Sequence, residues 1–139
     1  MKRQTLRAGS LRAEIGLEDG RLRSVTLPDK IPDEFDAAAL ADLCAQLAAY
    51  PIDLADAPPF IGAVWKRMMQ IPAGSALTYS ELAAAVGRPL AFRAVGQACA
   101  TNRRLLAIPC HRVVAADGLG GFGPGLHWKR KLLELEAHC

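Results

Sequence analysis

A proline-rich stretch at residues 51–59 divides the chain into two parts with different residue patterns. Pro51, Pro58 and Pro59 lie there among the carboxylates Asp53 and Asp56. Proline lacks an N–H group and disfavours helix in the residue before it, so no regular element can run through this stretch. We therefore predict a small N-terminal lobe over residues 1–55 and a second domain over residues 56–139.

The first lobe carries one strand pattern and one helix pattern. Apolar and polar residues alternate over residues 11–27 around a turn at 18–20, which is typical of a β-hairpin. Residues 33–50 are rich in Ala and Leu, and the larger apolar side chains recur at helical spacing. The sequence therefore predicts a hairpin followed by an amphipathic helix that ends at Pro51.

The second domain shows a helical pattern with one marked break. Apolar residues spaced for one helix face predict a helix up to about residue 70 (Ile61, Val64, Trp65 and Met68). A short helix capped by Thr78 or Ser80 runs to residue 86, and a second one covers residues 90–101. Residues 111–115 are expected to be extended, residues 118–125 form a glycine-rich loop, and a last helix covers 127–137. The predicted fold is α+β, with a mainly helical second domain that resembles a winged helix-turn-helix.

Composition excludes some classes of protein. Apolar residues make up 51% and charged residues 22%, which is the balance of a globular domain. A net charge of +3 tolerates a polyanionic partner but is equally ordinary in a metabolic enzyme. No apolar run is long enough for a membrane span and no signal core follows the N-terminus, so we expect a soluble protein of the cytoplasm or nucleoid, or of the nucleus in a eukaryote.

The four cysteines lie far apart and form no C-x-x-C pair: Cys44, Cys99, Cys110 and Cys139. This spacing favours neither a disulfide framework nor a zinc site, so we expect no metal. Cys110 alone has suggestive neighbours, since it lies between Pro109 and His111. A thiol beside an imidazole can gain thiolate content at neutral pH. The pair is weak evidence by itself, because adjacent side chains on an extended chain point to opposite faces and most intracellular cysteines are small buried hydrophobes.

The last helix offers a carboxylate for this pair. At 100° per residue, Leu132, Leu133 and Leu135 define its apolar face, with Glu136 within that face and Glu134 on the opposite side. A carboxylate on a core-facing stripe needs a partner, and a histidine that it orients would be one. The alternative is a glutamate at a helix end that reaches water.

The helix over residues 90–101 has an unusual stripe of small side chains. Arg93, Gly96, Gln97 and Ala100 share one face, which suits close approach to a minor groove, and Arg93 could fill the gap left by an extruded base. The neighbouring stripe of Val95, Cys99 and Asn102 would turn inward. The alternative explanation for the small residues is tight packing against another helix.

Several short motifs follow one another along this chain as they do in the O6-alkylguanine-DNA alkyltransferases, and the chain resembles that family. The matching residues run from about Pro59 to Glu136, and their centre is Pro-Cys-His-Arg with an upstream Arg and Asn. The motifs are Thr78-Tyr79-Ser80-Glu81, Arg93-Ala94-Val95-Gly96, Asn102, Pro109-Cys110-His111-Arg112-Val113-Val114, Gly120-Gly121-Phe122, and Leu132-Leu133 with Glu136.

The resemblance implies a repair reaction without a cofactor on double-stranded DNA that contains O6-alkylguanine. Cys110 would accept the alkyl group once per molecule, His111 would draw its proton through a water, and Glu136 would orient His111. Asn102 would hold the turn that bears Cys110, Tyr79 would neutralise charge on the departing guanine, and Arg93 would enter the base stack. The resemblance also implies a monomer that contacts DNA and the flipped base through further residues: Thr78, Tyr79, Gly96, Gln97 and Ala100 for DNA, and Pro109, Phe122, Gly123 and Pro124 for the substrate pocket.

The chain departs from the family pattern in its first lobe and at Pro124, and three alternative functions remain open. The first lobe is short and lacks the zinc ligands of some members, and Pro124 stands where glycine is common, which puts acceptance of bulky adducts in doubt. A non-catalytic alkyltransferase-like protein would have lost the cysteine at position 110. A helix-turn-helix regulator would need a further domain, which we do not expect here. A Cys-His-Glu hydrolase would need an oxyanion hole, and the sequence shows no segment that would form one.

Overall fold

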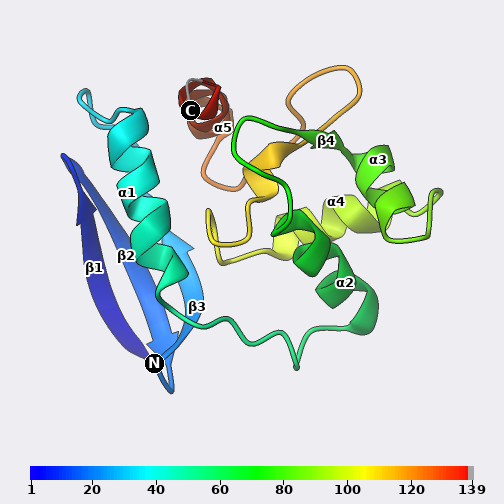
Figure 1. Cartoon of the computed structure of the whole chain (residues 1–139), viewed down its shortest axis with the longest axis horizontal. Helices are drawn as coiled ribbons and strands as arrows, with labels where there is room; N and C mark the ends of the chain where they lie inside the picture. Colours follow the sequence, from blue (N-terminus) through cyan, green and yellow to red (C-terminus); the bar gives the residue numbers. More distant parts are fainter. Residues whose placement is uncertain (138–139) are drawn as a thin grey trace.

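The computed structural model describes residues 1–137 and confirms the α+β class, and His138 and Cys139 lie outside the described residues. Three antiparallel strands form the first lobe, and one helix covers a face of their sheet (Figure 1). These elements are β1 (Lys2–Ala8), β2 (Leu11–Glu18), β3 (Arg21–Thr26) and α1 (Ala37–Ala48). The first lobe is therefore a sheet with one covering helix.

The first lobe differs from the prediction in an additional strand and in the residue at which its helix begins. The predicted hairpin is β2–β3, but β1 adds a third strand at the sheet edge, with Leu6 opposite Ala13. Only Leu6 and Ala8 of β1 are buried, so its apolar alternation is too weak to be seen in the sequence. Helix α1 begins four residues later than predicted, because the Asp36 side chain accepts a hydrogen bond from Ala39 N (2.8 Å) and caps it there.

The helical part of the second domain agrees closely with the prediction. Its elements are α2 (Pro59–Met68), α3 (Tyr79–Ala85), α4 (Phe92–Thr101) and α5 (Leu126–Glu136), and α3 and α4 pack together as the helix-turn-helix. Thr78 caps α3 through its hydroxyl, which accepts from Glu81 N at 3.1 Å, while the Glu81 carboxylate accepts from Thr78 N at 2.9 Å.

The segment around the cysteine was predicted wrongly. Residues 111–115 were expected to be extended, but Cys110–Arg112 form a 3₁₀ turn and only β5 (Val113–Val114) is a strand. That strand pairs in parallel with β4 (Leu77–Thr78), immediately before α3. This pairing holds the turn that carries the cysteine next to the start of the helix-turn-helix.

Apolar side chains form two cores that meet along the middle of the molecule. The first core combines the sheet and α1 with Trp128, Leu132 and Leu135 of α5. The second lies among α2, α3 and α4 and includes Cys110. Helix α5 thus belongs to the second domain by sequence but covers the first lobe, and the boundary at residues 55/56 stays a prediction. Within residues 1–137, no helix has the length and apolar character to cross a membrane.

Candidate active site

The 3₁₀ turn that bears Cys110 is held by the end of α4. Asn102, at the C-terminus of α4, donates from Nδ2 to the Ile108 carbonyl (2.8 Å) and accepts from Arg104 N at Oδ1 (2.9 Å). Within the turn, Cys110 N donates to the same Ile108 carbonyl at 2.8 Å. An amide side chain therefore fixes both arms of the loop between α4 and the thiol.

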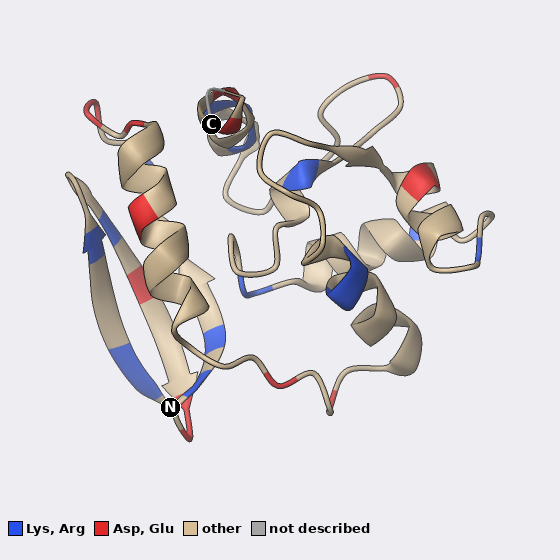
Figure 2. Ribbon diagram, viewed as in Figure 1, with Lys and Arg blue, Asp and Glu red and all other residues tan. Residues whose placement is uncertain are grey.

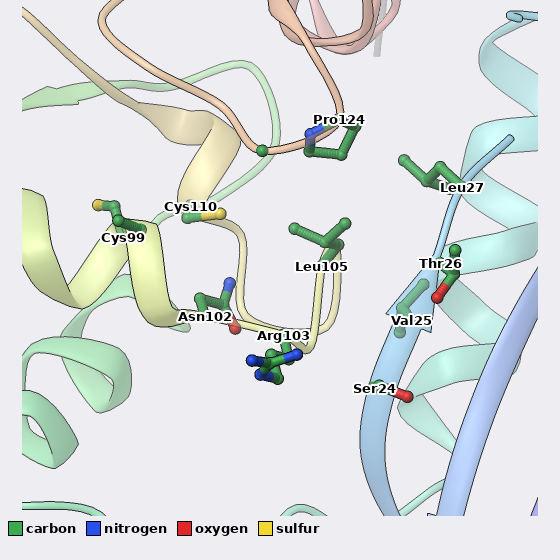
Figure 3. Close-up of a pocket in the computed structure, with 12 residues that line it drawn as sticks. Ser24, Val25, Thr26, Leu27, Cys99, Asn102, Arg103, Leu105, Cys110 and Pro124 are labelled. Atoms are coloured by element: carbon green, nitrogen blue, oxygen red, sulfur yellow. The ribbon is translucent and has the colours of Figure 1, made fainter. Parts of the chain in front are cut away.

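Cys110 is only 4% exposed, yet it borders two cavities. The smaller, about 180 Å³, lies between α4 and the glycine-rich loop and is lined by Tyr79, Gly96, Cys99, Ala100, Gly121, Phe122 and Gly123 besides Cys110. The larger, about 290 Å³, extends from Cys110 towards β3. Figure 3 shows the Cys110 sulfur pointing into this larger space, between Leu105 and Pro124. The thiol is enclosed but remains reachable beside α4.

His111, Arg112 and Glu136 form a buried polar cluster under the thiol. The Nε2 atom of His111 lies 3.0 Å from Glu136 Oε1. Arg112 donates to the same carboxylate from Nε (2.9 Å) and Nη2 (2.6 Å), and from Nη1 to the Ile71 carbonyl. Glu136 is only 2% exposed, and a carboxylate buried to this degree requires a partner. It has two, His111 and Arg112.

The surroundings of His111 define which nitrogen can act as a base. A carboxylate next to Nε2 holds the proton on that atom and leaves the lone pair on Nδ1. The Nδ1 atom is buried and has no hydrogen-bond partner among the described residues. Burial lowers the pKa of His111, so the ring is neutral at physiological pH. A neutral imidazole with a free Nδ1 can accept a proton.

Cys110 does not have the raised thiolate content that its neighbours in the sequence suggested. Burial raises the pKa of the thiol, and this outweighs the opposing effects of Asn102 hydrogen bonding and the Lys129 charge. At neutral pH the resting sulfur is therefore protonated. Its proton must be removed as the sulfur reacts.

Lys129 is a buried cation that the sequence reasoning missed. Its side chain is 0% exposed, and Nζ donates to the Val113 carbonyl (2.6 Å) and the Gly121 carbonyl (3.0 Å). It therefore joins the strand after the thiol to the glycine-rich loop. A signal was available, because at 100° per residue Lys129 lies only 20° from Glu136 on the same helix face.

Tyr79 lies against the glycine-rich loop at the mouth of the smaller cavity. Its hydroxyl oxygen accepts from Gly121 N (3.3 Å), which leaves its own proton free to donate. Gly120 has a φ of +72°, and a Cβ there would lie 2.5 Å from the Tyr79 oxygen, so only glycine fits. Burial raises the pKa of Tyr79 and keeps the phenol protonated.

The structure brings most of the predicted pocket residues together. Phe122 and Gly123 line the smaller cavity, and Gly123 and Pro124 line the larger one. Pro109 does not belong to this set: it is buried outside both linings, and its carbonyl accepts from Arg112 N and closes the 3₁₀ turn. Its role as a pocket residue stays a prediction.

The predicted DNA-binding stripe lies on the outer face of α4. Arg93, Gln97 and Ala100 are exposed and Gly96 is half-buried, whereas Val95 is buried in the second core. Thr78 is half-buried and serves as the cap of α3. The stripe of small residues is therefore largely exposed and is free to approach a groove.

The fold and the site together define a class of protein: a helix-turn-helix domain with an enclosed cysteine, a neutral histidine and a buried carboxylate behind its second helix. Over residues 1–137, no three His, Cys, Asp or Glu side chains gather closely enough to hold a metal ion. The site itself offers a thiol and proton acceptors around it.

Comparisons with known proteins agree with this class. Residues 59–138 match the family model described as the 6-O-methylguanine DNA methyltransferase, DNA binding domain. The chain is 44% identical over 101 residues to a methylated-DNA–protein-cysteine methyltransferase of Methanopyrus kandleri, covering 68% of this chain and 76% of that protein. A probable methyltransferase of the same name from Acanthamoeba polyphaga mimivirus is 46% identical over 78 residues, 56% of this chain, and the chain spans 52% of that protein.

A solved structure extends the likeness to the first lobe. The Mycobacterium tuberculosis protein OGT, in complex with DNA, superposes with a TM-score of 0.77 and 30% identity over 98% of this chain and 92% of that one. This chain belongs to the 6-O-methylguanine DNA methyltransferase family.

Proposed function

We propose that this chain repairs O6-alkylguanine in double-stranded DNA by moving the alkyl group onto Cys110, one lesion per molecule. The observation that carries the proposal is the Cys110 thiol next to two cavities and a histidine whose Nδ1 is free to accept a proton. The family membership and the DNA complex of the mycobacterial relative support the choice of partner.

The reaction is a displacement at a saturated carbon. The Cys110 sulfur forms a bond to the alkyl carbon, the bond from that carbon to guanine O6 breaks, and its electron pair stays with guanine. The thiol proton passes through a water to His111 Nδ1, and guanine takes up one proton, with the Tyr79 hydroxyl as its donor, so that a neutral base leaves. A thioether has no easy leaving group, and the protein is therefore used once.

The geometry suggests where each part of the substrate lies. The flipped guanine fits the smaller cavity, where Tyr79 and Phe122 flank it, and the alkyl group points past the sulfur into the larger one. Glu136 holds His111 in the tautomer that leaves Nδ1 free, and Asn102 holds the turn that carries the sulfur. Arg93, exposed near the start of α4, takes the place of the extruded nucleotide.

Location and assembly follow from the same chemistry. A reduced thiol is needed, and Cys110 and its neighbour Cys99 are both free, which suits a reducing compartment in contact with DNA. We propose that the protein acts in the cytoplasm or nucleoid, or in the nucleus of a eukaryote, and as a monomer, since one chain supplies every group used above.

The test is to mix the protein with a duplex that contains one O6-methylguanine and to weigh the intact protein. We expect a gain of one methylene on the peptide that contains Cys110, with no more than one guanine restored per protein molecule. The Cys110→Ser variant serves as the matched control. An unchanged mass, or repair of many lesions per molecule, would overturn the proposal.

A further inference from the structure

A basic cleft of about 610 Å³ lies between the N-terminal sheet and the end of α4, away from the thiol. Its lining includes four arginines and only two carboxylates. The arginines are Arg3, Arg23, Arg103 and Arg104, and the carboxylates are Glu18 and Asp56. Figure 2 shows Lys and Arg on β1 and β3 and on the chain that faces the sheet after α4.

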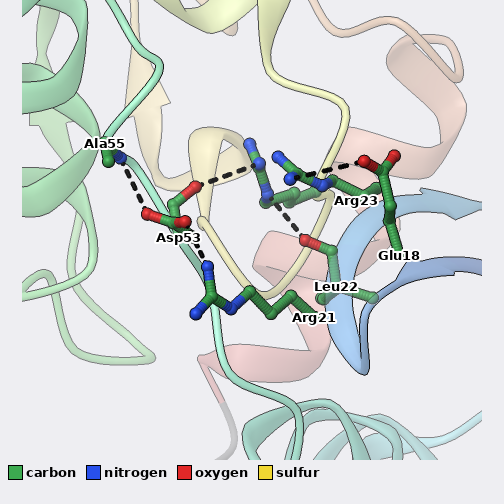
Figure 4. Close-up of polar contacts among 7 residues, drawn as sticks. Glu18, Arg21, Leu22, Arg23, Asp53 and Ala55 are labelled. Atoms are coloured by element: carbon green, nitrogen blue, oxygen red, sulfur yellow. Dashed lines mark hydrogen bonds and ion pairs between the residues drawn. The ribbon is translucent and has the colours of Figure 1, made fainter.

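Arg104 supplies positive charge that no carboxylate within residues 1–137 neutralises by contact. Its guanidinium donates to the carbonyls of Leu22 (3.0 Å) and Asp53 (3.4 Å) and lies over the Trp65 ring. The Asp53 carboxylate is engaged by Arg21 and by the amide of Ala55 (Figure 4). Desolvation, followed by repulsion from Arg23, lowers the pKa of Arg104, and both side chains line the same cleft.

Arg23 is short of hydrogen-bond partners. Its Nε atom is buried without an acceptor among residues 1–137. The Glu18 carboxylate lies 3.9 Å from Nη2, at the limit of an ion pair, and Glu18 is largely exposed (Figure 4). A buried guanidinium donor without an acceptor is costly, and a phosphate offers acceptors in the geometry that guanidinium prefers.

The cleft opens next to the DNA-binding face of α4. Thr101, the last residue of α4, lines the cleft, and it follows Ala100 of the outward stripe. With a rise of about 1.5 Å per residue, Thr101 lies about 12 Å along the helix from Arg93, which equals three to four base-pair steps of about 3.4 Å. A duplex bound along α4 therefore brings its backbone to this opening.

We propose that this cleft binds one backbone phosphate of the DNA, three to four base pairs from the flipped nucleotide, through Arg23 and Arg103. The proposal rests on the proposed function for its partner and deepens it, since it assigns the first lobe a direct part in holding DNA. Arg103 is exposed and also borders the larger cavity beside Cys110, so it lies between the thiol and the cleft.

The first experiment measures the affinity for undamaged duplex DNA at a series of salt concentrations, which requires no chemistry at Cys110. The variant is Arg23→Gln with Arg103→Gln, and the matched control is Arg7→Gln with Arg12→Gln, a cross-strand pair of exposed arginines on the sheet. The slope of log K against log salt falls by about 1 when one phosphate contact is lost. We expect this fall for the cleft variant only. Equal slopes in the two double variants would overturn the proposal.

The second experiment locates the phosphate. Each backbone phosphate around an O6-methylguanine is replaced in turn by an uncharged methylphosphonate, and the rate of methyl transfer is measured below saturation. We expect one flanking position at which the replacement slows the native protein several-fold but has no effect on the cleft variant. A sensitivity map that is the same for both proteins would overturn the proposal.

The two experiments separate the two claims. If the native protein transfers no methyl group, the proposed function fails, and the salt slopes still test the cleft. Should the double variant unfold, Arg103→Gln alone removes an exposed charge from the same cleft and is compared with Arg12→Gln in the salt series.

Discussion

Glu136 contacts both Arg112 and His111, and these contacts set its ionisation. The hydrogen bonds and charges of its partners outweigh burial and lower the pKa of the carboxyl group from 4.5 to about 2. A carboxyl whose pKa is lower in the folded state stabilises the protein above its unfolded pKa, and this stabilisation is lost as the pH falls through the folded value.

We therefore expect the free energy of unfolding to fall by about 3 kcal/mol between pH 4.5 and pH 2 because of this one group. The Glu136→Gln variant should lack this part of the acid sensitivity. It should also transfer methyl more slowly with little change in DNA affinity. Urea unfolding at several pH values measures the first effect, and Glu134→Gln, an exposed change on the same helix, is the control. A parallel pH profile in native and Glu136→Gln protein would contradict this assignment.

Lys129 is expected to position the loop that forms the pocket. The Lys129→Met variant keeps the apolar stem but leaves the carbonyls of Val113 and Gly121 without their donor. We expect transfer to slow by about tenfold, since a displacement of reacting groups by about 1 Å can cost up to a hundredfold. Single-turnover rates at saturating DNA provide the measurement. Arg130→Met, at an exposed position next to it, should transfer at the native rate.

At the scale of elements, β3 and the glycine-rich loop set the size of adduct that fits beside the sulfur. Pro124 stiffens the loop, yet a cavity of about 290 Å³ remains between it, Cys110 and β3. We expect benzyl as well as methyl to be transferred from O6 of guanine in a duplex.

The substitution Thr26→Trp on β3 tests this expectation, because an exposed strand position accepts a large side chain that would fill the cavity. At saturating DNA, benzyl transfer should slow by about tenfold or more, while methyl transfer stays within about twofold of the native rate. Thr5→Trp, exposed on β1, should affect neither. If the native protein transfers no benzyl group from O6-benzylguanine, the cavity does not hold the adduct.

At the scale of the whole molecule, α5 joins the two cores. Trp128 is buried in the first core, where it packs edge-on against Phe35 and donates to the Pro28 carbonyl, while Lys129 and Glu136 of the same helix hold the active site. A helix shared in this way should make the chain unfold as one cooperative unit.

The Trp128→Phe variant tests this cooperativity with a built-in probe. It removes one of the two tryptophans and leaves Trp65, which lies in the second core, as the fluorophore. We expect a loss of about 1–3 kcal/mol, through the hydrogen bond and the packing, that shifts the Trp65 transition and the far-UV circular dichroism transition equally. Transitions that separate would show that the cores unfold independently.

Local patterns in the sequence determined most of the helices and the chemical groups of the site. The face of α5 that carries Glu136, the inward stripe of α4 with Asn102, and the capping box at Thr78 follow from spacing along the chain, because helix geometry is fixed by local hydrogen bonds. Strand β1 was not predicted, because it is an edge strand that buries only two side chains. Its sequence therefore shows almost no alternation of apolar and polar residues.

Only the tertiary structure decided the ionisation of Cys110 and the second partner of Glu136. Desolvation depends on everything packed around a sulfur, so burial reversed the pKa direction suggested by the adjacent histidine. Arg112 reaches Glu136 across 24 residues because the chain turns at Cys110–Arg112 instead of running straight. The basic cleft likewise arises where β3 meets the end of α4, from residues that are distant in the sequence, and long-range contacts of this kind leave no local period to detect.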